Sequence, residues 1–147
     1  MHNPIYIGID PDIDKSGIAV WNPVLNDYES IECLGFWDII GFLLDNNKRI
    51  KEVRIEAGWL IKTNWHSMSK QGKQGIAETG RRVGMNHKTG QLMVEFCEKY
   101  NIPHKSIKPL SNNYWAESAE KFAATTGWKG KTNPEKRDAA MLVFGLK

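Results

Sequence analysis

Two short apolar segments, each ending in an acidic residue, constrain the fold of this chain more than any other feature. The first is Ile5–Asp10, and the second covers residues 51–56 and ends at Glu56. β-Branched and aromatic residues dominate the first segment and β-branched residues the second, so both are predicted to be strands. Between them, residues 37–47 carry apolar side chains at positions 37, 40, 43 and 44, which favours an amphipathic helix. This order predicts an α/β domain in which the second segment runs parallel to the first.

The remaining segments extend this prediction to a mixed sheet. Turn-forming residues fill positions 10–17, so residues 18–21 are expected to return as a hairpin, and residues 28–34 as a third antiparallel strand. A last strand is predicted at 104–110, and helices at 89–100, 114–124 and 134–146. Residues 62–84 have no clean periodicity and fit either a mobile loop or a polar helix. Three antiparallel strands therefore come first, and two strands reached through helices follow.

Composition limits the class of protein. With 147 residues, 41% of them hydrophobic and 25% charged, the chain is expected to form one globular domain over residues 1–147. Its longest apolar stretch, residues 36–44, is too short to cross a bilayer, and no secretory signal is recognisable at the N-terminus. Cys33 and Cys97 are then expected to be reduced, buried thiols rather than a disulfide. These features predict a cytoplasmic protein that does not bind membranes.

Four acidic residues are the strongest candidates for a functional site: Asp10, Glu56, Glu135 and Asp138. The first two end predicted strands, and the last two lie three residues apart on a predicted helix and so share a face. Like charges held close together repel, so such a cluster needs protons or divalent cations. Two Mg²⁺ ions about 3.5–4 Å apart, held by carboxylates, are an established arrangement for phosphodiester hydrolysis. The four acids therefore predict a Mg²⁺ site, with Mn²⁺ as a possible replacement and two ions as the expected number.

Each acid also has a simpler interpretation. Asp10 fits the start of a turn before Pro11, and Glu56 and Asp138 fit surface acids. Glu135 fits a helix capping box in which its side chain bonds back to the backbone of Thr132. The set of four is more specific than any one member.

The aspartates that follow Asp10 require separate treatment. The spacing of Asp10, Asp12 and Asp14 is similar to the start of an EF-hand calcium loop, but Lys15 and Trp21 stand where that loop needs Gly and Glu. An EF-hand is therefore excluded. Asp12 is interpreted as a turn residue or a spare metal ligand.

Several motifs together resemble the RuvC-type Holliday junction resolvases of the ribonuclease H-like superfamily. The opening of that family is similar to residues 7–11 and 16–20, and its second motif is similar to residues 54–56. Its glycine-containing central helix is similar to residues 80–93, and its terminal acid-x-x-Asp-Ala motif to residues 135–140. The resemblance implies a five-stranded mixed sheet flanked by helices, with Asp10, Glu56 and Asp138 as metal ligands and Glu135 as the fourth acid. It also implies a homodimer that cuts opposing strands of a four-way junction. Asp12 and Glu135 depart from the usual family residues, Gly and Asp.

A basic region lies between the acids. Positions 62–88 hold six Lys or Arg residues and one acid, Glu78. Candidate phosphate contacts in this region are Lys70, Lys73, Arg81, Arg82 and Lys88. A solvated basic face is the alternative. Trp59 and Trp65 are candidates for base stacking or for the core, and the pattern does not choose between His66, His87 and His104 as helpers of proton transfer.

Three functions follow from these features. The first is a metal-dependent endonuclease acting on branched DNA, which the four acids and the basic region favour. The second is a DNA-binding module of the same fold that does not cut, which the departures at Asp12 and Glu135 favour. The third, ranked below both, is a nucleotide-binding phosphotransfer domain, because residues 7–10 also suit the phosphate loop of actin-like and sugar-kinase folds. Those folds need two large lobes, and 147 residues supply one.

Overall fold

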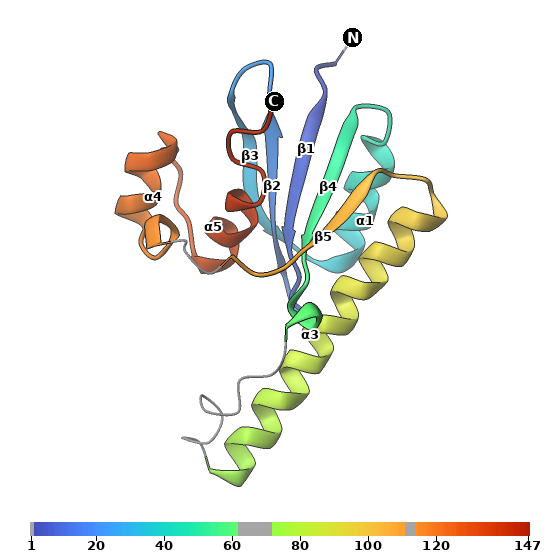
Figure 1. The fold of residues 1–147 in the computed structure, drawn as a ribbon, viewed down its shortest axis with the longest axis vertical. Coiled ribbons are helices and arrows are strands. Elements are labelled where there is room, and N and C mark those ends of the chain that lie inside the picture. The colour runs from blue at the N-terminus through green and yellow to red at the C-terminus, as the bar shows by residue number, and fades with distance from the viewer. Residues whose placement is uncertain (1, 62–71, 111–113) are drawn as a thin grey trace.

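The protein folds around a five-stranded mixed sheet with the strand order β3-β2-β1-β4-β5 (Figure 1). The computed structural model describes residues 2–61, 72–110 and 114–147. The strands are β1 (Ile5–Asp10), β2 (Ser16–Asn22), β3 (Asp27–Leu34), β4 (Ile50–Glu56) and β5 (His104–Ile107). β1, β2 and β3 pair antiparallel, whereas β4 pairs parallel with both β1 and β5. The predicted sheet of three antiparallel and two parallel strands is confirmed.

Helices cover both faces of the sheet (Figure 1). One face packs against α1 (Phe36–Asp45) and the C-terminal part of α3 (Lys73–Lys99), and its core includes Ile39, Met93 and Cys97. The other face packs against α4 (Ala119–Thr126) and α5 (Pro134–Met141), around Trp21 and Phe122. Two short 3₁₀ turns, η1 (Gly58–Leu60) and η2 (Tyr114–Ala116), complete the described elements.

The alternation of side chains along β1 and β4 sends the two strand-end acids to one face. Ile5, Ile7 and Ile9 point into the α1–α3 core, as do Val53 and Ile55. Successive side chains of a strand lie on opposite faces, so Asp10 and Glu56 lie on the α5 face. Because Ile9 pairs with Ile55 in the parallel ladder, these acids follow as neighbours at the same sheet edge.

Two glycines allow α5 to lie unusually close to the sheet. A Cβ on Gly8 would overlap the carbonyl oxygen of Ala139, and a Cβ on Gly17 would overlap that of Glu135. The backbone of α5 therefore rests directly on β1 and β2. This contact brings the first turns of α5 to the end of β1.

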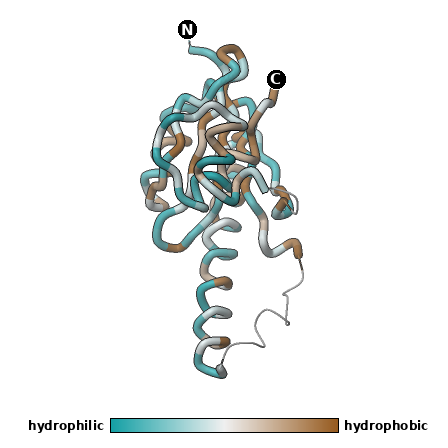
Figure 2. The backbone as a smooth tube through the Cα atoms, turned by 90° about the vertical axis from the view of Figure 1, so that its left-hand side faces the viewer, coloured by the Kyte–Doolittle hydropathy of each residue, from teal (hydrophilic) through white to brown (hydrophobic). Residues whose placement is uncertain are grey.

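α3 is longer than the sequence indicated. Its 27 residues join the predicted helix at 89–100 to most of the ambiguous segment 62–84, of which residues 62–71 lie outside the described part. Only Thr89, Gly90, Met93 and Cys97 are buried, and residues 73–84 are exposed or half-buried. Figures 1 and 2 show this N-terminal half projecting beyond the sheet, with mostly hydrophilic residues along it. We call residues 73–88 the α3 arm.

Other predicted boundaries were wrong in detail. The helix expected at 114–124 is a 3₁₀ turn followed by α4, because Ser118 caps α4 by accepting a hydrogen bond from the Lys121 amide. The final helix ends at Met141 rather than at 146, in a series of turns that contains Gly145 at φ 76°. The last strand ends at Ile107.

Both cysteines are free thiols. Cys97 is buried as expected, but Cys33 is only half-buried, so the expectation of burial was wrong for Cys33. No described helix is both long and apolar enough to span a membrane.

Candidate active site

Three of the four predicted acids converge at one edge of the sheet. Asp10 ends β1, Glu56 ends the neighbouring β4, and Asp138 lies on α5 above them. Each offers a carboxylate oxygen, and these oxygens all lie within 4.8 Å of one another. All three side chains are half-buried. Asp10 and Glu56 are 46 positions apart in the sequence, and Glu56 and Asp138 are 82 positions apart. The fold brings the three into one acidic cluster, which we call the acid triad.

The environment of the acid triad disfavours charge. Burial and the neighbouring Glu56 and Asp138 raise the pKa of Asp10 from 3.8 to about 9. Burial also raises the pKa of Glu56, with a further contribution from Asp138, and burial is the main cause that raises the pKa of Asp138. The carboxyls of Asp10 and Glu56 share a hydrogen bond, so the metal-free site holds at least one proton. A divalent cation would replace that proton.

Glu135 lies next to the acid triad but is not a member of it. Its charge raises the pKa of both Asp10 and Asp138, so it is close enough to repel them. None of its oxygens joins the group of oxygens within 4.8 Å. The capping-box alternative was wrong, because Asn133, not Thr132, caps α5 by accepting a 2.8 Å hydrogen bond from the Lys136 amide. Glu135 therefore contributes charge to the edge of the site.

A buried arginine holds the segment before α5 in place. Arg137 Nε donates to the carbonyl of Ala116 at 2.6 Å, and its Nη1 donates to Thr132 Oγ1 at 3.0 Å. These bonds tie the start of α5 to η2. Its charge also lowers the pKa of Asp138 and so partly offsets the effect of burial. Nothing in the sequence pattern distinguished Arg137 from the surface cations around it.

A cavity of about 160 Å³ opens beside the acid triad, between the sheet edge and α3. Its lining residues are Asp10, Pro11, Glu56, Gly58, Trp59, Val83, Asn86 and His87. A smaller hollow on the other side of Glu56 is lined by Leu110, Asp138, Met141 and Leu142. Glu56 thus borders two hollows, one shared with Asp10 and one shared with Asp138.

Glycines shape the wall of the larger cavity. A Cβ on Gly58 would come within 2.8 Å of His87 Nε2, and a Cβ on Gly90 would come within 2.6 Å of the Trp59 ring. The Trp59 and His87 rings meet edge to face, with centroids 6.3 Å apart. The sequence named Trp59 and His87 only among several aromatic and histidine candidates. The sequence feature that could have indicated this wall is Gly58, two residues after Glu56, because a glycine there allows close approach of another side chain.

The structure separates the three histidines that the sequence could not rank. His87 lines the cavity next to Asp10 and Glu56. His104 lies at the start of β5, where its Nδ1 is 2.9 Å from the carbonyl of Ile102. His66 and Trp65 lie outside the described residues.

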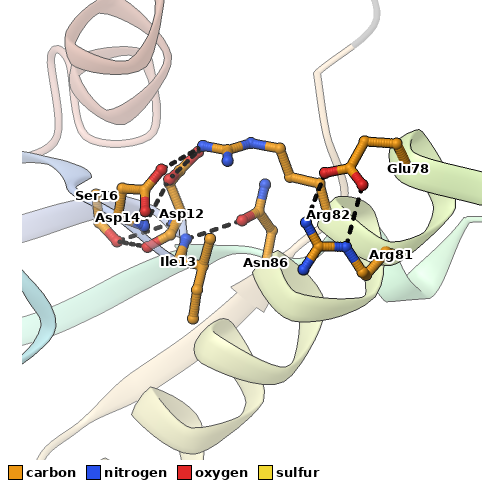
Figure 3. Close-up of polar contacts among 8 residues, drawn as sticks. All are labelled: Asp12, Ile13, Asp14, Ser16, Glu78, Arg81, Arg82 and Asn86. Carbon is orange, nitrogen blue, oxygen red and sulfur yellow. Dashed lines mark hydrogen bonds and ion pairs between the residues drawn. The ribbon is translucent and has the colours of Figure 1, made fainter. Parts of the chain in front are cut away.

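The described candidates for phosphate contacts all lie on the α3 arm. Lys73 and Lys88 are exposed. Arg81 forms an ion pair with Glu78 at 2.6 Å, and Arg82 forms ion pairs with Asp12 and Asp14 (Figure 3). Lys70 lies outside the described residues. Two of the four cations are therefore engaged with carboxylates.

Asp12 is a turn residue rather than part of the acid triad. Its Oδ1 accepts a 2.8 Å hydrogen bond from the Asp14 amide, and its own amide donates to Ser16 Oγ at 2.9 Å. Of the two interpretations left open by the sequence, the hydrogen bonds favour the turn role.

Comparisons with known proteins identify the fold. No family model matches the sequence, and no curated protein matches it. The structure of Thermus thermophilus RuvC in complex with a Holliday junction substrate superimposes with a TM-score of 0.59 at 16% identity, over 97% of this chain and 91% of that chain. A second Thermus thermophilus RuvC structure gives a TM-score of 0.55 at 13% identity, over 95% and 91%. The chain therefore has the ribonuclease H-like fold of the RuvC type, as the sequence predicted.

Proposed function

We propose that this chain is a divalent-metal-dependent endodeoxyribonuclease that hydrolyses phosphodiester bonds in branched DNA, with four-way junctions as preferred substrates. The observation that carries the proposal is the convergence of Asp10, Glu56 and Asp138 on a RuvC-type fold. A structural neighbour was solved with a Holliday junction substrate, which supports the choice of DNA. Resolving such junctions would place the protein in DNA recombination and repair, in the cytoplasm.

The residues of the site fit Mg²⁺ or Mn²⁺. The acid triad supplies only oxygen ligands, which these hard cations prefer, and bound ions would offset the repulsion that raises the three pKa values. Two ions, when bound, would activate the attacking water and stabilise the leaving oxygen. Asp10, Glu56 and Asp138 would hold the ions, since their carboxylate oxygens lie within 4.8 Å of one another, and Glu135 would be the fourth acid at the edge of the site.

We propose that the α3 arm binds the DNA backbone. Its exposed cations (Lys73, Arg81, Arg82 and Lys88), with Lys70, would neutralise phosphates without reading sequence. The arm leads directly into the cavity wall at Val83, Asn86 and His87. DNA lying along the arm would therefore reach the acid triad.

A homodimer is part of the proposal. Cutting opposing strands of a junction requires two active sites, and each chain has one acid triad among its described residues. An apolar groove on the α1–α3 face is a suitable interface, because Trp37 is 79% exposed and Tyr100 is 47% exposed there. Sedimentation of Trp37→Ala should show a weaker dimer. Val24→Ala, at an exposed turn, is the matched control.

A cleavage assay tests the proposed function. Purified protein is incubated with labelled four-way junction or with duplex of the same sequence, in Mg²⁺, Mn²⁺ or EDTA. We expect cleavage of the junction only with metal, and loss of cleavage in Asp10→Asn. Metal-independent cutting, or full activity of Asp10→Asn, would refute the role of the acid triad.

The second candidate is a binding module that recognises branched DNA without cutting it. The position of Glu135 outside the acid triad favours it, because the fourth acid is then not arranged as a ligand. Tight junction binding with no cleavage in either metal would support this candidate over the first.

A further inference from the structure

The ion pairs of Arg82 join two segments that are 68 to 70 residues apart in the sequence (Figure 3). Arg82 Nη2 is 3.2 and 3.4 Å from the two carboxylate oxygens of Asp12 and 2.8 Å from an oxygen of Asp14. Two carboxylates therefore surround one guanidinium nitrogen. Their oxygens occupy positions around Arg82 that the oxygens of a phosphodiester would take.

The acidic side of this contact is fixed. Asp12 lies in the loop that follows Asp10, and the hydrogen bonds from Asp14 N to Asp12 Oδ1 and from Asp12 N to Ser16 Oγ hold that loop. Ser16 is buried. The loop therefore presents both carboxylates from a rigid backbone.

The ion pairs themselves are exposed to solvent. The Arg82 side chain is 49% exposed and that of Asp14 is 71% exposed. Such exposed ion pairs contribute little to stability, so a competing anion can replace them at small cost. The helix keeps a separate attachment, because Asn86 Oδ1, one turn along α3, accepts a 2.8 Å hydrogen bond from the Ile13 amide.

Arg82 is also close to where DNA would arrive. Its neighbour Val83 lines the cavity that contains Asp10 and Glu56, as does Asn86. Release from the two aspartates would leave a long, charged side chain on the α3 arm, one residue before Val83 of the cavity wall. The same release would leave Asp12 and Asp14 unpaired beside the incoming backbone, which opposes binding.

We propose that Asp12 and Asp14 act as an internal substitute for a DNA phosphate, and that the DNA backbone binds the α3 arm by displacing them from Arg82. This inference rests on the proposed function and adds a restraint on it. The pair of aspartates lowers the affinity for any nucleic acid backbone. Only DNA that makes enough additional contacts with the protein would displace them.

Binding measurements on a mutant cycle test this inference. Fluorescence anisotropy of a labelled four-way junction is measured in Ca²⁺, and the DNA is checked afterwards for cleavage. We expect Asp12→Asn/Asp14→Asn to bind about three- to tenfold more tightly, because the competitor is removed while Oδ1 of residue 12 is retained. Asp38→Asn/Asp45→Asn, which removes two exposed acids of α1, is the control for net charge and should change affinity less.

The Arg82→Ala variant distinguishes displacement of the two aspartates from a general repulsion between these acids and DNA. Arg82→Ala should weaken binding and lower the salt slope by about 0.9, as expected for one lost phosphate contact. In this background the two Asn substitutions should tighten binding clearly less than they do when Arg82 is present, because only the general repulsion remains to be removed. Equal tightening with and without Arg82, weaker binding of the double Asn variant, or absence of DNA binding would overturn the inference.

Two further measurements keep the result interpretable. Arg82→Lys retains the charge, so its affinity for the junction should lie between those of wild type and Arg82→Ala. A loss of affinity caused by misfolding would appear as a lower melting temperature. Junction cleavage in Mg²⁺ is measured on the same proteins. Normal cleavage with no coupling between Arg82 and the aspartates would overturn only this inference, whereas no cleavage in any variant would count against the proposed nuclease.

Discussion

Replacing Asp10 by Asn should stabilise the metal-free protein while abolishing the proposed DNA cleavage. Asp10 has a pKa raised from 3.8 to about 9 in the folded state, mainly by burial and then by Glu56 and Asp138. A carboxyl with a raised pKa stabilises the fold fully below its unfolded pKa, and this contribution is lost as the pH rises toward the folded pKa. The folded protein must therefore keep a proton that the unfolded chain releases above pH 4.

The size of this effect follows from the shift. Each pH unit above 3.8 costs the folded state about 1.4 kcal/mol, up to a pH of about 9. At pH 7 the cost is about 4 kcal/mol, which is an upper value because Asp10 shares a proton with Glu56. Asn has the same shape and no charge. We therefore expect Asp10→Asn to be more stable than wild type by as much as about 4 kcal/mol at pH 7 in EDTA, and equally stable near pH 4.

Urea unfolding between pH 4 and pH 9 measures the difference. The gap between Asp10→Asn and wild type should widen with pH, whereas Asp45→Asn, an exposed acid at the end of α1, should change stability by less than about 0.5 kcal/mol throughout. Mg²⁺ should narrow the gap by stabilising only wild type. For a Kd of about 1 mM, 10 mM Mg²⁺ adds about 1.4 kcal/mol.

Parallel pH curves for Asp10→Asn and wild type would refute this reasoning. They would mean that Asp10 is not held against other carboxylates in solution. Equal stabilisation of both proteins by Mg²⁺ would show that the ion binds elsewhere.

Three other outcomes follow from the site. Gly17→Ala should destabilise the protein by about 1–3 kcal/mol in urea unfolding and reduce cleavage, because the added Cβ would push α5 away from β2. Gly41→Ala is the control and should have neither effect, because the space around Gly41 in α1 is open. A stable, active Gly17→Ala would disprove the close contact. In the cleavage assay Asp138→Asn should reduce the rate more than about 100-fold and Glu135→Gln less than about tenfold. The reason is that Asp138 belongs to the acid triad and Glu135 does not. A reversed order would make Glu135 the ligand. The apparent affinity for Mg²⁺, measured by calorimetry, should increase from pH 6 to pH 9, because the ion must displace the proton that burial favours on Asp10. An affinity that does not depend on pH would contradict the raised pKa of Asp10.

The sequence was sufficient to predict the sheet and all three residues of the acid triad, because both depend on short-range patterns. The apolar runs of β1 and β4 have the period of strands, and each ends in the acid that the structure brings to the sheet edge. The position of Asp138 followed from its spacing on a helix next to an apolar segment. Neither pattern showed that Glu135 would stay outside the acid triad, because that depends on the rotation of α5 on the sheet.

The features that the sequence did not reveal depend on contacts between distant segments. The N-terminal half of α3 carries no apolar face, so its helix has no hydrophobic period to detect. Arg82 was recognised as a cation, but its partners lie about 70 residues earlier in the chain. The cavity wall of Trp59 and His87 likewise requires α3 and η1 to meet.

The alternation that places Asp10 and Glu56 on one face also makes the acid triad sensitive to the alignment of β1 with β4. A shift of either strand by one residue would reverse its faces and send one acid into the α1–α3 core. A misaligned sheet would therefore keep only two of the three acids of the triad on a common face. A divalent ion bound as proposed would stabilise only molecules whose strands are correctly aligned, so during folding such an ion would select the native pairing over its competitors.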